Sequence, residues 1–524
     1  MANRTQSIIR AWPGLVAAAV VVALTLGTLG AVALRSEGLG SLGPSDWAAL
    51  RFTLIQAFLS AVISIVVAVP VARALARRQF VGRAALITLL GAPFILPVIV
   101  AVLGLLAVFG RNGLVSILFG WIGLAPVQLY GLHGVVLAHV FFNLPLATRL
   151  ILQGWLSIPS ERFRLAASLG LCARDVNRVF QRPMLREVLP GAFMLVFVIC
   201  TTSFAVALTL GGGPRATTIE LAIYQAFRFD FDLGHAAILA LLQFAICALA
   251  ALAMLWVQIP NASGVGLDRN IQRWDAQAGF HKIADIAWIS IAAGFLLLPL
   301  GMIIWRGIAG LVDLPPQIFA AAGRSVLVAL TSAALTIVLG LSLTFGVVGL
   351  RSRRVLAGSM ESIGYLAIAA SPLVIGVGLF ILLFPIVNPV VIALPLTAVV
   401  NALMALPFVL RMLVPAVGQI ESQFGRLADS LGLIGWARVS RLHLPRLRRP
   451  LGFSAGLAAA LSMGDLGVIA LFSDPDRATL PLQMYRLMAG YRMETAAGAA
   501  LLLLILSLLL FWIFDRGGRV DVDA

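Results

Sequence analysis

Residue types that usually perform chemistry are scarce in this chain and scattered along it. The three cysteines, Cys172, Cys200 and Cys247, and the five histidines include no pair at the spacing of a metal site. The sole lysine, Lys282, is not part of a G-x-x-x-x-G-K-[ST] phosphate-binding loop, a pattern that does not occur. We therefore expect a protein that is not an enzyme and holds no metal or cofactor of its own.

A second set of polar residues could line a path for a cation. Asp465 lies inside the apolar stretch 453–473, where a carboxylate costs about 2.5–3.5 kcal/mol and normally faces water or a partner group. A structural hydrogen bond between helices is the alternative role for Asp465. Two candidates follow the glycine run 211–213, which we interpret as a helix terminator. The candidate path comprises Ser203, Glu220, Tyr224, Asp465 and Tyr485.

The elements that must position these residues are membrane-spanning helices. The 524 residues are 61% hydrophobic and 11% charged, which excludes a soluble enzyme and a disordered chain. A helix needs about 20 apolar residues to cross about 30 Å of hydrocarbon. Twelve segments meet this criterion, at 12–34, 52–76, 84–109, 131–153, 188–210, 236–258, 284–305, 325–350, 362–384, 389–412, 453–473 and 496–514.

The distribution of basic residues predicts the orientation of the chain. If the N-terminus is cytoplasmic, 28 of the 38 basic residues fall in cytoplasmic loops or termini. This bias follows the positive-inside rule and places both termini in the cytoplasm. It also accounts for the formal net charge of +16 without a nucleic-acid partner. The loops after the fourth and tenth segments are the most basic, with seven such residues each.

These two loops belong to an internal repeat. Shifting the sequence by 262 residues aligns Leu144-Pro145 with Leu406-Pro407, and Pro183 with Pro445. Apolar composition alone does not explain matching Pro, Gly and Arg positions in loops. The sequence therefore predicts two six-span halves of the same topology, related by an axis along the membrane normal.

Within each loop a short helix is expected to end at a glycine. The stretches 161–169 and 422–431 precede Gly170 and Gly432, where glycine can adopt the left-handed conformation of a C-cap. A second short helix and a proline follow, with arginines expected on the solvated side and Leu and Ala on the other. The alternative is that the arginines only contact lipid headgroups at the membrane surface. Two copies in equivalent positions favour instead a docking site for a cytoplasmic protein.

Both loops resemble a signature of the permease subunits of bacterial ABC importers: E-A-A-x-x-x-G, then nine residues, then I-x-L-P. The copies read Arg164-Leu165-Ala166-Ala167-Ser168-Leu169-Gly170 and Arg426-Leu427-Ala428-Asp429-Ser430-Leu431-Gly432, with arginine in place of the signature Glu. The resemblance implies coupling loops at about 158–187 and 420–449. Its ATPase-coupling residues would be Arg164, Leu165, Ala166, Gly170, Pro183, Arg426, Leu427, Ala428, Gly432 and Pro445.

Within that family the chain is most similar to the fused permeases of thiamine and thiamine pyrophosphate importers, in stretches 139–145, 210–226 and 462–467. Fused ferric-iron permeases are the alternative. The resemblance implies an all-α, polytopic protein of the bacterial inner membrane with pseudo-two-fold symmetry. It implies as partners two copies of a cytoplasmic ATPase, which binds the ATP and Mg²⁺, a periplasmic thiamine-binding protein, and membrane lipid.

The resemblance covers two permease modules, 51–258 and 324–514. Outside them we expect an extra helix and outer loop at 1–50, a cytoplasmic linker and a seventh, extra helix at 259–323, and a cytoplasmic tail at 515–524. An ion-coupled carrier of twelve spans is the competing class. Because nearly every span lacks a carboxylate, proton or sodium coupling is disfavoured.

Overall fold

The computed structural model of the chain describes residues 12–36, 38, 42–91, 95–213, 216–255, 279–351, 353–472 and 477–518. Within these ranges all regular structure is helical. This is the expected outcome in hydrocarbon, where each backbone amide must find its hydrogen-bond partner within the protein. Most of the predicted linker, 259–278, and the end of the predicted tail, 519–524, lie outside the described residues.

Eleven helices in the described ranges are long and apolar enough to cross a membrane. A bent pair, α16 (Arg354–Ala369) and α17 (Pro372–Leu383), makes twelve if it is counted as one span. The prediction of about twelve spans is therefore confirmed. The predicted third span differs in detail, because the structure divides 84–109 into α4 (Arg83–Leu89) and α5 (Val98–Phe109).

The first half of the chain consists of α3 to α13. Short helices alternate with long ones, and the breaks recur in the second half. Besides α4 and α5, the elements are α3 (Pro44–Arg77), α6 (Leu114–Trp121), α7 (Leu132–Leu156), α8 (Ser160–Ser168), α9 (Ala173–Val176), α10 (Arg182–Thr201), α11 (Phe204–Leu210), α12 (Ile219–Arg228) and α13 (Leu233–Leu255).

The second half, α15 to α23, repeats this order. Its longest helix, α18, covers the positions that correspond to both α7 and α8. Besides α16 and α17, the elements are α15 (Pro316–Gly349), α18 (Ala393–Ser430), α19 (Gly435–Arg438), α20 (Leu444–Met463), α21 (Gly467–Phe472), α22 (Leu480–Ala489) and α23 (Met493–Gly518).

Equivalent hydrogen bonds connect equivalent helices in the two halves. The Ile219 amide at the start of α12 donates to Oγ1 of Thr53 on α3, at 3.0 Å. The Leu480 amide at the start of α22 donates to Oγ of Ser325 on α15, at 2.8 Å. Each buried hydroxyl thus satisfies an amide that has no partner within its own helix. The internal repeat therefore extends to the bonds that position the short helices.

The helices at the start of each half pack across the halves. α1 (Trp12–Val22) and α2 (Thr28–Arg35), joined by a π-helical turn, pack on α15, α16 and α17. α14 (Gly279–Leu311) packs on α3, α5 and α23. Gly14 brings α1 very close to α15, because a Cβ there would lie 2.6 Å from the Cα of Gly346. Small residues allow this backbone approach between membrane helices.

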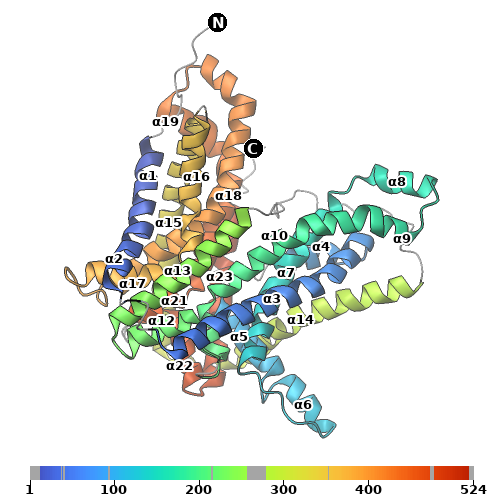
Figure 1. The fold of residues 1–524 in the computed structure, drawn as a ribbon, viewed down its shortest axis with the longest axis horizontal. Coiled ribbons are helices and arrows are strands. Elements are labelled where there is room, and N and C mark those ends of the chain that lie inside the picture. Colours follow the sequence, from blue (N-terminus) through green and yellow to red (C-terminus); the bar gives the residue numbers. More distant parts are fainter. Residues whose placement is uncertain are drawn as a thin grey trace.

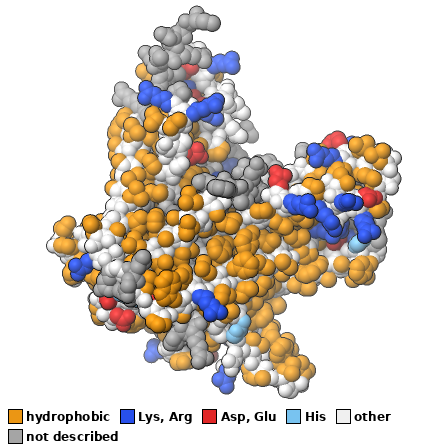
Figure 2. Space-filling view, viewed as in Figure 1, with side chains coloured by type: hydrophobic (Ala, Val, Ile, Leu, Met, Phe, Trp, Pro, Cys, Tyr) orange, Lys and Arg blue, Asp and Glu red, His pale blue; other side chains and the backbone are white. Residues whose placement is uncertain are grey.

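The structure divides into two arms that diverge toward the repeated loops. In Figure 1, α8 and α9 lie at the end of the arm on the right, and α19 lies in the upper arm, while α12, α17, α21 and α22 gather near the junction at the lower left. Figure 2 shows basic side chains over the far ends of the arms and a mainly apolar surface between them. Lipid can solvate such an apolar surface, whereas exposing it to water has an unfavourable free energy.

The close contact between α1 and α15 gives a direct test of the cross-half packing. Replacing Gly14 by leucine should force α1 away from α15 and cost about 1–3 kcal/mol of stability, as overpacking typically does. The measurement is the midpoint of thermal unfolding in detergent. Gly30→Leu is the matched control, since nothing lies within 4 Å of a Cβ at that position. Equal midpoints for the two variants would contradict the packing described here.

Candidate functional site

Each repeated loop turns at a left-handed glycine. Gly170 has a φ of +64° and Gly432 a φ of +63°, and a Cβ at either position would have nothing within 4 Å. The expected left-handed C-cap is confirmed at both positions. After a second short helix, each loop continues through a π-helical turn, at Asn177–Gln181 and at Val439–His443. The two loops therefore share an unusual backbone path.

The helix that approaches the glycine differs between the loops. In the first loop α7 ends at Leu156 and α8 begins at Ser160, whereas α18 continues unbroken to Ser430. Pro159 lies in the break, and its counterpart in the repeat is Glu421. Proline lacks an N–H group and is disfavoured inside a helix, which favours a break at Pro159, although α18 contains Pro407 and Pro415 without ending there. With 38 residues, α18 is about 57 Å long and extends well beyond the hydrocarbon.

The leucines of the repeated loops are exposed, and the expectation that they face the same side as the alanines is wrong. Leu165 and Leu427 are 59% and 57% exposed, whereas Ala166 and Ala428 are buried. Leucines and alanines lie one residue apart and hence on different faces of the helix. Exposed leucines at matching positions form an apolar surface of the kind that partner proteins cover. The other predicted coupling residues, Arg164, Pro183, Arg426 and Pro445, are exposed as well.

The second loop contains a partly buried ionic network that was not predicted from the sequence. Arg438 is 2% exposed and donates from Nη2 and Nε to both carboxylate oxygens of Glu421, at 2.6 and 2.9 Å. Its Nη1 donates to Oδ1 of Asp429 at 2.7 Å, and Nε2 of His443 lies 2.8 Å from Oε1 of Glu421. The counterparts in the first loop are Val176, Pro159, Ala167 and Gln181.

The first loop is held together by aromatic contact instead. The rings of Phe163 and Phe180 pack edge to face with their centroids 5.9 Å apart. The repeat register contained the signal for this difference, because it places Arg438 where the first copy has Val176. Two loops with nearly the same backbone are thus stabilised by different chemistry.

Ser203 and Asp465 lie at equivalent breaks between helices, not within continuous helices. Ser203 separates α10 from α11, and Asp465 separates α20 from α21. Asp465 therefore lies within a candidate membrane span, Gly435–Phe472, as predicted, but at a break in the helix of that span and not in a continuous helix. Oδ1 of Asp465 accepts a hydrogen bond from the Gly467 amide at 3.2 Å. Among the described residues, no group donates a hydrogen bond to its buried Oδ2.

The two breaks lie close to each other. A Cβ built on Gly467 would be 3.8 Å from the Phe204 ring, so the start of α11 contacts the start of α21. Asn401 on α18 interacts with the Asp465 carboxylate and donates to Oγ of Ser462 at 3.0 Å. The break after α20 therefore places one carboxylate among polar groups at the contact between the halves.

Glu220 is completely buried near the start of α12. The side chains of Gln243 on α13 and Ser371 at the start of α17 interact with its carboxylate. No hydrogen bond of normal geometry reaches either oxygen from the described residues. Its counterpart in the repeat, with one residue dropped, is Pro481, so this carboxylate belongs to the first half alone.

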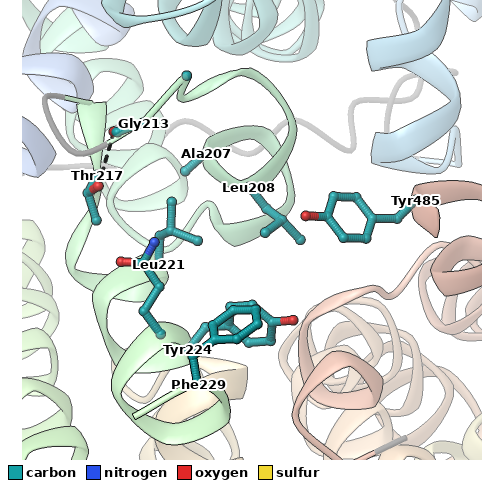
Figure 3. Close-up of a pocket in the computed structure, with 10 residues that line it drawn as sticks. Ala207, Leu208, Gly213, Thr217, Leu221, Tyr224, Phe229 and Tyr485 are labelled. Atoms are coloured by element: carbon teal, nitrogen blue, oxygen red, sulfur yellow. Dashed lines mark hydrogen bonds between the residues drawn. The ribbon is translucent and has the colours of Figure 1, made fainter. Parts of the chain in front are cut away.

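Tyr224 and Tyr485 meet in one pocket of about 200 Å³. Tyr485 extends from α22 toward Leu208, while Tyr224 and Phe229 lie together on the opposite wall (Figure 3). The rings of Tyr224 and Phe229 contact each other edge to face at 5.7 Å. Glu220, Asp465 and Ser203 are not among the lining residues. The structure therefore brings together the two tyrosines of the predicted path but not its carboxylates.

An aromatic cluster that the sequence analysis missed lies beside α12. Phe227 of the first half packs on Phe380 of α17 and Phe472 of α21, with ring centroids 4.7 and 6.4 Å away. All three side chains come from short helices at the junction of the arms. Individual phenylalanines in apolar sequence give no sign of such a cluster, because packing residues have the same composition.

Comparison with known proteins shows what this arrangement is similar to. No protein-family profile matches the chain. The chain is 40% identical to the thiamine transport system permease protein ThiP of Salmonella typhimurium, over 98% of both chains. It is 40% identical to ThiP of Escherichia coli over the full length of both, and 38% identical to ThiP of Brucella abortus over 98% and 96%.

The chain belongs to the ThiP permease family. A ThiP-type chain with this many apolar helices is a multi-pass protein of the inner membrane, and its role is that of a transport permease. The ferric-iron alternative is not favoured by these relatives. In the described parts of the chain, no group of three His, Cys, Asp or Glu side chains could hold a metal ion.

The ionic network predicts that Arg438 stabilises the second loop of this ThiP-type permease. Arg438→Ala leaves the Glu421 carboxylate without its buried cation, and breaking such a pair costs up to about 3–5 kcal/mol. We expect a lower midpoint of thermal unfolding, measured on the purified chain in detergent. Arg441→Ala, a change at an exposed arginine of the same turn, is the control. If both variants unfold at the wild-type temperature, the network has no structural role.

Proposed function

We propose that this chain is the fused permease of an ATP-driven importer that carries thiamine, and thiamine pyrophosphate, across the bacterial inner membrane. The main support is the similarity to ThiP proteins over the whole length, at 40% identity. The two left-handed glycine turns with exposed leucines add support, because an ATP-driven permease needs two docking surfaces for its ATPase. An ion-coupled carrier would not need such surfaces.

The partners follow from the same arrangement. One ATPase copy would dock on each repeated loop and would bind the ATP and Mg²⁺, since this chain has no phosphate-binding loop. A periplasmic thiamine-binding protein would deliver the substrate to the opposite face. The basic side chains at the ends of the arms support a cytoplasmic location for the loops, and the distribution of basic residues along the sequence supports the same location for both termini.

The substrate path would use the polar groups at the junction of the halves. Thiamine carries a thiazolium cation, which needs an anion or an aromatic face when it leaves water. Tyr224 and Tyr485 offer aromatic faces in the pocket, and Asp465 offers a carboxylate oxygen at the central break. At an effective dielectric constant near 20, a carboxylate about 4 Å from a cation contributes roughly 4 kcal/mol before desolvation.

The proposed function is tested by uptake of labelled thiamine. Cells that lack this chain should lose uptake and regain it with the intact gene. In proteoliposomes, transport should require the ATPase, ATP and the binding protein. Uptake driven by an ion gradient alone, or normal uptake without this chain, would reject the proposal.

The turns at Gly170 and Gly432 predict a backbone requirement for coupling. Valine at either position should uncouple ATP hydrolysis from uptake, because a β-branched residue disfavours positive φ while no neighbour blocks the side chain. Asparagine tolerates this conformation better, so Gly432→Asn should retain more activity than Gly432→Val. The measurements are the uptake rate, the rate of ATP hydrolysis and the retention of the ATPase on purification. Equal activity of the two variants would argue against a conformational role.

The carboxylate at the central break predicts charge-dependent transport. Asp465→Asn keeps the shape of the side chain but removes its charge, so it should slow thiamine uptake by about tenfold or more. Ser203→Ala at the equivalent break should have a mild effect. Initial rates are normalised to the amount of permease in the membrane and to the ATPase bound. A wild-type rate in Asp465→Asn would leave this residue as a structural hydrogen-bond partner.

A further inference from the structure

Two aromatic residues in the described parts of the chain adopt a backbone conformation that normally belongs to glycine. Phe231 has a φ of +54° and Tyr491 a φ of +59°, and they are the only residues other than glycine with positive φ in these parts. Each lies in the turn between a short helix and the long helix that follows, α12–α13 and α22–α23, two residues before the long helix begins, although the repeat register that aligns Tyr224 with Tyr485 places Phe231 opposite Arg492. Bulky residues rarely adopt this conformation, and it is found mainly where function requires it.

Hydrogen bonds hold both turns in this conformation. The Asp232 amide donates to the carbonyl oxygen of Ala226 at 3.0 Å, and the Arg492 amide donates to that of Leu487 at 2.9 Å. The Arg492 bond closes the end of α22 as in a Schellman motif, with Tyr491 in the left-handed position where glycine is usual, whereas the Asp232 bond spans one residue more. Both halves nevertheless carry an aromatic residue there. A role of the aromatic side chains that glycine could not fill would explain this choice of residue.

That role is not packing within the chain. Phe231 is 79% exposed and Tyr491 is 88% exposed. Beside Phe231, an open hollow of about 650 Å³ is lined by Leu34, Arg35 and residues 230–234. Each turn thus presents an aromatic ring outward, and the first turn presents it next to a concave surface. Protein interfaces are enriched in such rings, which fill pockets on the partner.

The charges around the two rings differ. Exposed Asp230 and Asp232 flank Phe231, with Arg35 nearby, whereas exposed Arg492 and Glu494 follow Tyr491. The first turn is therefore acidic, while the second has one charge of each sign. A partner that covers both turns would need a basic surface opposite Phe231 only. Anionic lipid headgroups would be repelled by the acidic turn, which favours a protein partner.

We propose that Phe231 and Tyr491 are paired anchors for a protein partner on the face opposite the repeated loops, with the more basic part of the partner's surface on Phe231. This inference rests on the proposed function for the identity of the partner, the periplasmic thiamine-binding protein. Each half of the permease contributes one anchor, since Phe231 lies between α12 and α13 and Tyr491 between α22 and α23. The acidic turn then selects one of the two possible orientations of the partner.

Substitution by glycine separates docking from folding. In Phe231→Gly and Tyr491→Gly, glycine accepts the left-handed conformation without strain, so the unfolding temperature should stay equal or rise. Association with the purified thiamine-loaded binding protein should weaken by about tenfold or more, as is typical of anchor residues. Binding is measured on the complete permease–ATPase complex in lipid nanodiscs. Phe384→Ala, a change at another exposed aromatic residue, should bind like wild type.

A charge variant tests the proposed orientation. Asp230→Lys should slow association and reduce its dependence on salt, whereas Glu494→Gln should leave both unchanged. Wild-type affinity in both glycine variants would overturn the inference and leave the rings as lipid contacts. If the wild-type complex binds the loaded protein and transports thiamine while the glycine variants do so equally well, only this inference fails. If the wild type does neither, the proposed function itself fails.

Discussion

A peptide group without a hydrogen-bond partner in hydrocarbon costs several kcal/mol, so a membrane chain can leave the helical conformation only where other protein surrounds it. The breaks at Ser203 and Asp465 meet this condition, because the start of α11 contacts the start of α21. Each half thus shields the interrupted backbone of the other. The polar groups of the candidate path can lie at this junction because the second copy of the repeat covers them. A single half would expose them to lipid.

Much of the fold could be predicted from composition and from the repeat. Segment length and hydropathy predicted the number of spans, and glycine chemistry predicted the turns at Gly170 and Gly432. The break before Asp465 could not be predicted, because the flanking residues are as apolar as those of a continuous helix. The expectation that Leu165 lies on the same side as Ala166 was wrong. The two residues are adjacent in sequence, and the helical period places adjacent residues on different faces.

The two halves share a backbone but differ at the residues that carry charge. Arg438 corresponds to Val176, Asp465 to Ser203 and Glu220 to Pro481. Under the proposed function, a symmetric backbone would suit two copies of an ATPase, whereas thiamine has no symmetry and needs different groups on its two sides. Gene fusion permits this combination, because each half can change without changing the other. Sequence reasoning detects such differences only after the repeat has aligned the two halves.

The cross-packing of α1 has a consequence for synthesis of the protein in the cell. This helix leaves the ribosome before every other described helix, yet the contact of Gly14 with Gly346 forms only after more than 300 further residues have been translated. Until then α1 has lipid as its neighbour on that face. Assembly must therefore finish late, when α15 inserts beside a helix that has waited in the bilayer. A ribosome that stops early would leave a first half that is inserted but lacks a lasting partner for its first helix.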